Sequence, residues 1–252
     1  MVLLSACASN EKLTYLQNIA ETGQDNIFEK NKPGYKLQPG DVLYIRVITS
    51  SEDINKIFDP LMGGQGSQRI SPENMYFNGY NISDSGYIEM PILDTIYVNN
   101  LTLEQAKRRI KQKAGQYLKK AQVIVKMANF RFTVLGEVKA PGAKEVLDDQ
   151  INIFEALAYA GDITYNGNRQ EVLIIRPTGE GSRTFRVDMT NKELIEQPLY
   201  YIQPNDIIYV KPLRSALIRE RSSDYMFLLS AASSVLSSTA IILNIINYFD
   251  RP

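Results

Sequence analysis

Histidine is absent from this 252-residue chain, and cysteine occurs only once. Histidine is the commonest general base and a usual metal ligand, so its absence excludes a Ser-His-Asp triad, a Cys-His pair and a zinc site built on histidine. A single cysteine cannot form an internal disulfide bond. Paired carboxylates can hydrolyse glycosidic bonds without histidine, but no Asp or Glu of this chain stands in a recognisable motif. We therefore expect no catalytic residue, no metal and no cofactor, and a carboxylate-based glycan hydrolase remains only as a third alternative.

The single cysteine, Cys7, follows the small and aliphatic residues Leu4-Ser5-Ala6. This string resembles the lipobox of bacterial lipoproteins, in which the cysteine becomes the first mature residue and carries lipid. The alternative is that Cys7 is an ordinary apolar residue near a chain end. A signal peptide needs a basic region and about 7–15 apolar residues, and only residues 1–6 precede Cys7. We expect residues 1–7 to be the remnant of a lipoprotein signal and the polar residues 8–32 to be a tether.

The charge balance is neutral, with 28 Lys plus Arg against 28 Asp plus Glu. Hydrophobic residues make up 44% of the chain and charged residues 22%, which is typical of a soluble globular protein rather than a disordered or polytopic membrane protein. A nucleic-acid partner is not expected, because nucleic-acid binders usually carry a basic excess. The length favours about two modules.

A turn signal occurs twice. Pro39-Gly40-Asp41 and Pro204-Asn205-Asp206 are each preceded by Gln and followed by a β-branched and aromatic run with Tyr at the same position. Proline fixes its φ and the next residue accepts a positive φ, so each string predicts a turn that leads into a strand. We expect each copy to open or close one module.

The patterning along the chain predicts an α+β fold with a mixed or antiparallel sheet. Runs rich in β-branched and aromatic residues predict strands at 42–48, 87–92, 94–98, 122–127, 130–138, 171–176 and 183–188. Apolar periodicity predicts a helix at 102–120, where Thr102 and Gln105 form a capping box. Asn152 and Glu155 predict a short helix over 153–160. The polar stretch 50–86 is expected to be a long loop with short strands.

The helix predicted at 102–120 has a basic face on an otherwise neutral protein. Its members are Lys107, Arg108, Lys111, Lys113, Lys119 and Lys120. A solvated helix surface explains this face, and contact with an anionic glycan or lipid headgroup is the alternative.

The C-terminal region contains 25 residues without a charge, 225–249. As a helix this segment would be ~37 Å long, against a hydrocarbon core of about 30 Å, and aromatic residues lie near both of its ends. Small and polar residues recur every three or four positions and form one stripe: Ser230, Ser233, Ser234, Ser237, Ala240, Asn244 and Asn247. Such a stripe is typical of helix–helix contact in a membrane or of a water-filled lumen. A membrane-inserted helix in a many-helix barrel is favoured; a membrane dimer, a soluble amphipathic helix and a soluble dimerisation face are the alternatives.

Four features in this order resemble the outer-membrane polysaccharide export lipoproteins of the Wza type, a polysaccharide biosynthesis/export family with an SLBB domain. Residues 35–45 are similar to the opening of the family's export domain, and 86–91 with 100–106 are similar to its closing strands and helix. Residues 132–142 and 155–161 resemble a soluble-ligand-binding β-grasp (SLBB) module, although Asp162 stands where the pattern has a second glycine. Cys7 and the C-terminal amphipathic segment complete the order.

The resemblance implies a β-rich export domain at 33–128 and one SLBB β-grasp domain at 129–212. A linker at 213–224 and a transmembrane amphipathic helix at 225–249 follow. It further implies a homo-oligomeric ring, commonly of eight subunits, that forms a passive conduit for capsular polysaccharide or exopolysaccharide. The expected location is the bacterial outer membrane, with a lipid anchor and a periplasmic body.

The partners implied by the resemblance are other copies of the chain, the polysaccharide, outer-membrane lipid and an inner-membrane co-polymerase, often a tyrosine kinase. The main alternative function is a lipid-anchored glycan-binding or adhesive module without a pore, in which exposed Tyr side chains stack on sugars.

Overall fold

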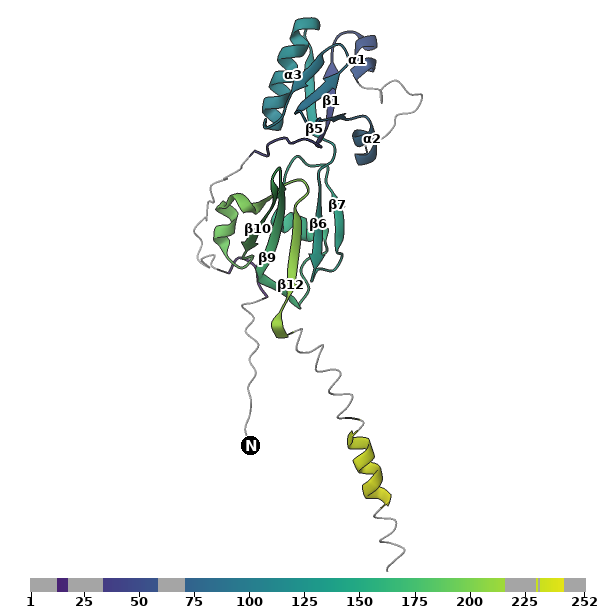
Figure 1. The fold of residues 1–252 in the computed structure, drawn as a ribbon, viewed down its shortest axis with the longest axis vertical. Helices are drawn as coiled ribbons and strands as arrows, with labels where there is room; N and C mark the ends of the chain where they lie inside the picture. The colour runs from purple at the N-terminus through teal and green to yellow at the C-terminus, as the bar shows by residue number, and fades with distance from the viewer. Residues whose placement is uncertain (1–12, 18–33, 59–70, 216–229, 231, 243–252) are drawn as a thin grey trace, which may run out of the picture.

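The computed structural model describes residues 13–17, 34–58, 71–215, 230 and 232–242 (Figure 1). Within these residues, no sheet combines strands from both sides of Asn129: the strands that precede it pair only with one another, and so do the strands that follow it. We refer to residues 34–128 as the first module and to residues 129–215 as the second module. Helix and strand both contribute substantially, which confirms the α+β prediction.

The first module is built on a three-stranded antiparallel sheet. Its order is β2 (Tyr80–Asn81), β1 (Val42–Ile48) and β5 (Gln122–Met127). The 15-residue helix α3 (Leu103–Tyr117) packs on β5 and buries Ala106, Ile110 and Ala114. Thr102 and Gln105 form the predicted capping box, which satisfies backbone donors at the start of the helix. A two-stranded hairpin of β3 (Tyr87–Met90) and β4 (Asp94–Tyr97) completes this module.

The described residues of the stretch 50–86 contain two short helices besides the short strand β2, so the expectation of a long loop with short strands missed the helices. These helices are α1 (Glu52–Phe58) and α2 (Pro72–Phe77). The Ser71 hydroxyl caps α2 by accepting a hydrogen bond from the Asn74 N–H (3.2 Å), and Phe58 and Met75 are buried. Local capping and two buried apolar side chains are enough to form helices in a stretch whose composition is otherwise polar.

The second module contains a five-stranded mixed sheet. Its order is β10 (Gly181–Val187), β9 (Gly167–Thr178), β12 (Ile207–Pro212), β6 (Arg131–Gly136) and β7 (Gly142–Glu145). The β12–β6 pair is parallel, and the other pairs are antiparallel. Helix α4 (Ile153–Tyr159) begins with the predicted Asn152–Glu155 capping box. It lies beside the short pair of β8 (Ile151–Asn152) and β11 (Tyr201–Ile202), and 3-10 turns occur at Lys192–Glu196 and Pro198–Tyr200.

Residues 13–17, which belong to the expected tether, pack against the second module. The backbone N–H groups of Leu16 and Gln17 donate to the carbonyls of Met189 and Thr190 (3.3 and 2.7 Å). The Tyr15 hydroxyl donates to the Asp162 carboxylate, and the guanidinium of Arg169 lies 5.2 Å from the centre of the Tyr15 ring. Burial, followed by the Asp162 carboxylate, raises the pKa of Tyr15, so this hydroxyl remains a donor at any physiological pH.

Of the predicted transmembrane segment 225–249, residues 225–229, 231 and 243–249 lie outside the described residues. Ser230 and residues 232–242 are helical, and their described side chains are exposed. In the part of the chain that the structure describes, no helix has both the length and the apolar character needed to cross a bilayer.

A close backbone approach at Gly136 generates the first prediction. Its φ is 86°, and a Cβ there would lie 2.1 Å from the Val210 carbonyl oxygen on β12. We expect Gly136→Ala to lower the free energy of unfolding by about 3 kcal/mol, from left-handed strain and overpacking, as measured by urea denaturation. Gly115→Ala is the matched control, because its Cβ would enter open space on α3 and should stabilise the protein by about 0.5–1 kcal/mol. Equal effects at the two positions would contradict this account.

Candidate functional site

The two turns predicted from the repeated Gln-Pro-x-Asp string lie at the junction between the modules. Gly40 and Asn205 occupy the same position in each turn, with φ of 87° and 65°. In each turn the Asp carboxylate accepts a hydrogen bond from the Gln backbone N–H three residues before it, at 2.9 Å for Asp41 and 2.8 Å for Asp206. Residues of both turns line one small cavity of about 120 Å³, so the two turns face each other.

Both turn carboxylates are buried, with 3% of Asp41 and none of Asp206 exposed. Each therefore needs a donor beyond its own turn, and the two copies use different ones. The Tyr35 hydroxyl donates to Asp41 (3.0 Å), whereas Arg176 binds Asp206 through Nε and Nη2 (2.9 and 2.7 Å). Burial raises the pKa of Asp41, and the bonds from the Gln38 N–H and the Tyr35 hydroxyl only partly oppose this rise.

Residues 128–130 link the two modules. Hydrogen bonds of Asn129 join this link to the first turn, and hydrogen bonds of the next residue after the link, Arg131, join it to the second turn. Asn129 accepts a hydrogen bond from the Val42 N–H (3.0 Å) and donates to the Gly40 carbonyl (3.2 Å). Arg131 accepts at its carbonyl from the Asn205 N–H (2.7 Å) and donates through Nε to the Asn205 side chain (3.4 Å). Because the link is anchored at both ends, the turns fix how the chain crosses between the modules.

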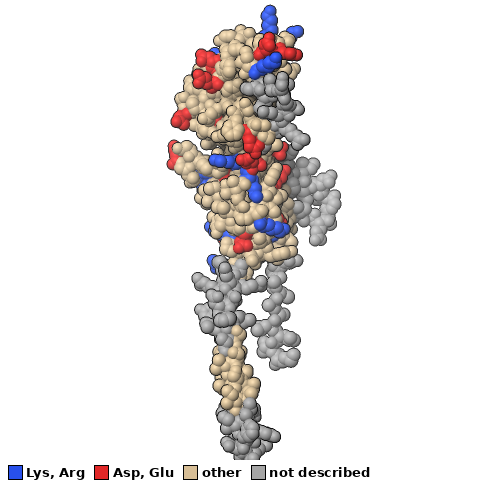
Figure 2. Space-filling model, turned by 90° about the vertical axis from the view of Figure 1, so that its right-hand side faces the viewer, with Lys and Arg blue, Asp and Glu red and all other residues tan. Residues whose placement is uncertain are grey.

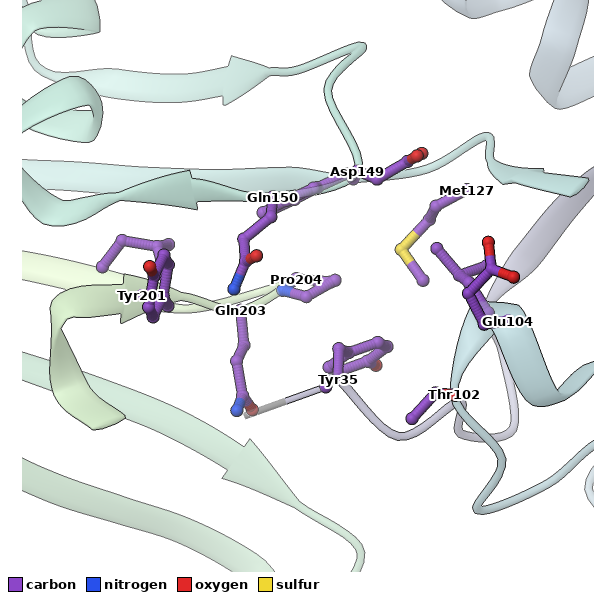
Figure 3. Close-up of a pocket in the computed structure, with 13 residues that line it drawn as sticks. Tyr35, Thr102, Glu104, Met127, Asp149, Gln150, Tyr201, Gln203 and Pro204 are labelled. Atoms are coloured by element: carbon purple, nitrogen blue, oxygen red, sulfur yellow. The ribbon is translucent and has the colours of Figure 1, made fainter. Parts of the chain in front are cut away.

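A larger cavity of about 340 Å³ opens on one side of this junction (Figure 3). Tyr35, the N-terminus of α3 and Met127 contribute from the first module, and Gln150 and residues 201–204 contribute from the second. Figure 3 shows the Gln150 side chain directed toward Gln203 and Pro204. The side-chain amide oxygen of Gln150, Oε1, is buried and accepts no hydrogen bond within the described residues. The cavity is therefore largely apolar, with one unused acceptor in its wall.

The arrangement does not form a recognisable catalytic centre. Asp41, the one carboxyl group with a raised pKa in the described residues, has its oxygens engaged by Tyr35 and Gln38. Glu104, at the rim of the larger cavity, forms an ion pair with Lys107 (3.7 Å). No group of three or more potential metal-ligating side chains comes together in the described parts of the chain.

The other residues singled out from the sequence are distributed as follows. Cys7, Asn244 and Asn247 lie outside the described residues. Ser233 and Ser237 donate their hydroxyl protons to the carbonyls of Ser230 and Ser233 on their own helix (2.9 and 2.8 Å). Ser230, Ser233, Ser234, Ser237 and Ala240 are exposed. Four of the predicted basic residues, Lys107, Arg108, Lys111 and Lys113, lie on α3 and are exposed or half-buried. The helix ends at Tyr117, earlier than predicted, so Lys119 and Lys120 are exposed residues that follow it. Lys113 lies 6.0 Å from the centre of the Tyr117 ring.

Sequence reasoning missed Arg176, Tyr35 and the contacts of residues 13–17. Arg176 lies 30 positions from Asp206, and Tyr15 lies 147 positions from Asp162, so no local spacing connects these pairs. The Asp that recurs in both turns was the signal in the sequence that could have revealed these donors. A buried Asp carboxylate requires a hydrogen-bond donor from elsewhere in the fold.

Arg176→Ala should lower the free energy of unfolding by about 3–5 kcal/mol, because it leaves the Asp206 carboxylate buried without its counter-charge. Arg176→Lys keeps the charge but cannot donate two parallel bonds, so its loss should be smaller but measurable. Arg183→Ala is the control: Arg183 lies opposite Arg176 in the β10–β9 register and is exposed. Its effect should stay within about 0.5 kcal/mol in urea denaturation. Equal losses for the two alanine variants would disprove the role of the Arg176–Asp206 pair.

Asp41→Asn should change how stability depends on pH. The folded protein holds the Asp41 proton more tightly than the unfolded chain, because burial raises this pKa above 3.8. The wild-type chain therefore loses stability from this group as pH rises through the raised pKa, and the Asn variant does not. The wild-type free energy of unfolding minus that of Asp41→Asn should therefore fall as pH rises above about 4. A difference that rises with pH over this range would refute the assignment.

Residues 29–128 match the family model described as polysaccharide biosynthesis/export protein. The chain is similar to the EPS I polysaccharide export outer membrane protein EpsA of Ralstonia nicotianae, with 26% identity over 189 residues, 70% of this chain and 47% of the relative. It is also similar to the protein of the same name from Ralstonia solanacearum, with 25% identity over 200 residues, 75% of this chain and 50% of the relative. The chain thus spans about half the length of these relatives. These matches confirm the resemblance to polysaccharide export proteins that the sequence motifs indicated.

Proposed function

We propose, on the premise that residues 29–128 form a polysaccharide biosynthesis/export domain, that this chain is one subunit of a homo-oligomeric ring in the bacterial outer membrane. The ring is a passive conduit for capsular polysaccharide or exopolysaccharide and performs no catalysis. The match of residues 29–128 carries this proposal, and the names of the two relatives support export and an outer-membrane location.

In this proposal residues 129–212, which make up most of the second module, form an SLBB β-grasp domain that stands next to the membrane. Lipid on Cys7 and a transmembrane helix at 225–249 attach the chain, and the polar stripe faces the lumen of a helical barrel. An inner-membrane co-polymerase delivers the polymer from the periplasmic side.

The positions at which the chain enters and leaves the second module support this two-point attachment. Tyr15 binds Asp162, and the Leu213 N–H, just after β12, donates to the Asn166 carbonyl (2.6 Å). One loop, 160–167, therefore contacts both the N-terminal segment and the start of the C-terminal segment. In Figure 1 residues 13–17 and the end of β12 lie at the end of the second module that is far from α3. Two membrane attachments that leave from one end are compatible with a body that stands upright on a bilayer.

The helical residues 232–242 support a place for this segment among other helices. Ser233, Ser237, Ser238 and Thr239 donate their hydroxyl protons to carbonyls of the same helix, so the helix does not need water to satisfy these donors. Its large apolar side chains are exposed in the single chain: Val235, Leu236, Ile241 and Ile242. Val235 and Ile242, seven positions apart, share one face of the helix, and exposed apolar side chains of this size favour contact with lipid or with protein.

The proposal predicts that detergent-extracted full-length protein forms a closed ring with a central cavity in electron micrographs. In a strain that lacks the gene, the wild-type chain should restore surface polysaccharide, whereas a chain without 225–252 should accumulate folded but not export. Cys7→Ser should fold normally and be lost from the outer-membrane fraction.

Monomers or dimers in every detergent, even at high protein concentration, would refute the conduit. Normal export by the chain without 225–252 would refute the role of the helix, and unchanged fractionation of Cys7→Ser would refute lipidation. Hydrolysis of a glycan by the purified protein would favour the carboxylate-based alternative.

A further inference from the structure

A second groove, of about 440 Å³, lies at the junction between α2 and the strands β6 and β7. We call it the α2 groove. Its walls are Tyr76 and Phe77 from the first module and Arg131 and Glu145 from the second, with Glu73 at its edge. Figure 2 views the molecule from the side on which α2 and β7 lie in Figure 1, and charged side chains of both signs gather around the middle of this face. The α2 groove therefore combines aromatic and charged walls that belong to different modules.

The two aromatic side chains of the α2 groove are more exposed to solvent than is usual for apolar residues. Phe77 is 81% exposed and Tyr76 is 51% exposed, while Met75 beside them is buried and holds α2 against the module. The two rings contact each other edge to face, with centroids 5.8 Å apart and an interplanar angle of 77°. Each ring restrains the other, so the pair offers a preformed surface to a ligand. The negative face of an aromatic ring attracts the slightly positive C–H groups that line one side of a sugar ring.

The polar wall holds hydrogen-bonding groups that the protein leaves unused. Arg131 and Glu145 are opposite each other in the β6–β7 register, but they form no ion pair within the described residues. Arg131 donates only Nε, to Asn205, so its two terminal nitrogens have no protein acceptor among those residues. The Glu145 carboxylate likewise accepts no hydrogen bond from the described residues, and its oxygens are available to hydroxyl groups of a ligand.

The charge of the α2 groove limits the class of ligand. Two carboxylates, Glu73 and Glu145, face one guanidinium, Arg131, so an acidic ligand would meet a net negative charge. A ligand with many hydroxyl groups and one apolar face satisfies both walls without adding charge.

We propose that the α2 groove is a subsite for an uncharged stretch of a saccharide chain. A sugar ring packs on Phe77 and Tyr76, and its hydroxyl groups bond to Arg131 and Glu145. This proposal rests on the proposed export function and gives it a contact surface outside the C-terminal segment. Because the two walls belong to different modules, a bound sugar bridges the junction that the buried Asp turns hold in place.

The chain contains no tryptophan, so a single introduced tryptophan can report on the α2 groove. In full-length protein in detergent, Phe77→Trp keeps an aromatic face at the site and adds a fluorophore. Tyr165→Trp is the matched control, since Tyr165 is 84% exposed and does not line the groove. The probes are maltotetraose, cellotetraose and chitotetraose as uncharged ligands and tetragalacturonate as the acidic one.

We expect a saturable change in Phe77→Trp emission with at least one uncharged tetrasaccharide, with a Kd of about 1–10 mM. Tyr165→Trp should show no saturable change, and tetragalacturonate should bind Phe77→Trp at least about tenfold more weakly. Adding Arg131→Gln to Phe77→Trp should weaken binding about tenfold, through loss of a charge-assisted hydrogen bond, whereas adding Arg183→Gln should leave it unchanged.

Four outcomes would overturn the subsite. They are no saturable change with any uncharged probe up to about 50 mM, an equal response of the two reporters, tighter binding of tetragalacturonate, or an emission change with protein concentration alone. The last outcome would show that a second copy of the chain occupies the α2 groove. If the protein forms rings but binds no sugar, the subsite proposal is wrong and the conduit proposal is unaffected. If a monomer binds sugar and no ring forms, the conduit proposal is wrong and the subsite proposal is unaffected.

Discussion

The burial of two carboxylates, Asp41 and Asp206, is the constraint on which the arrangement of this molecule depends. A buried carboxylate must be bonded on several sides, and each of these is bonded by its own turn and by a donor from outside that turn. For Asp206 the outside donor is Arg176 on β9, which ties the turn to the neighbouring strand of the second sheet. For Asp41 it is Tyr35, whose hydroxyl is held as a donor because burial and the nearby carboxylate raise its pKa. Moving either turn would leave a charge or a hydroxyl unsatisfied.

Both turns lie where the chain passes from one sheet to the other, so this constraint is also what defines the junction. Asn129 is hydrogen-bonded to the first turn and Arg131 to the second, and only Phe130 lies between them. Phe130 is itself buried, and its carbonyl accepts from the Val146 N–H (2.9 Å). The cavity beside Gln150 and the α2 groove both border this fixed link, which gives their walls a defined separation even though the walls come from different modules.

Local features of the structure could be predicted from the sequence, and long-range pairings could not. The capping pairs Thr102–Gln105 and Asn152–Glu155 were predictable because both partners belong to one turn of helix. The strands at 42–48 and 122–127 were predictable from their β-branched runs. Helices α1 and α2 were not, because their stability comes from burying Phe58 and Met75 in the module rather than from periodicity. The repeated Gln-Pro-x-Asp string predicted two turns, but only the fold places them face to face and supplies Tyr35 and Arg176.

The loop 160–167 has a mechanical consequence. It bonds the N-terminal segment through Asp162 and the segment after β12 through Asn166, and the buried Arg169 just beyond it donates to the carbonyls of Ile163 and Thr164 (3.0 and 3.2 Å). Tension applied between the two chain ends would pass through this short loop and its arginine brace. The load path would bypass the first sheet, the link at Phe130 and both buried turns. With the two attachments proposed above, a pull on the N-terminal segment relative to the segment after β12 would therefore load the second module and leave the junction unstrained.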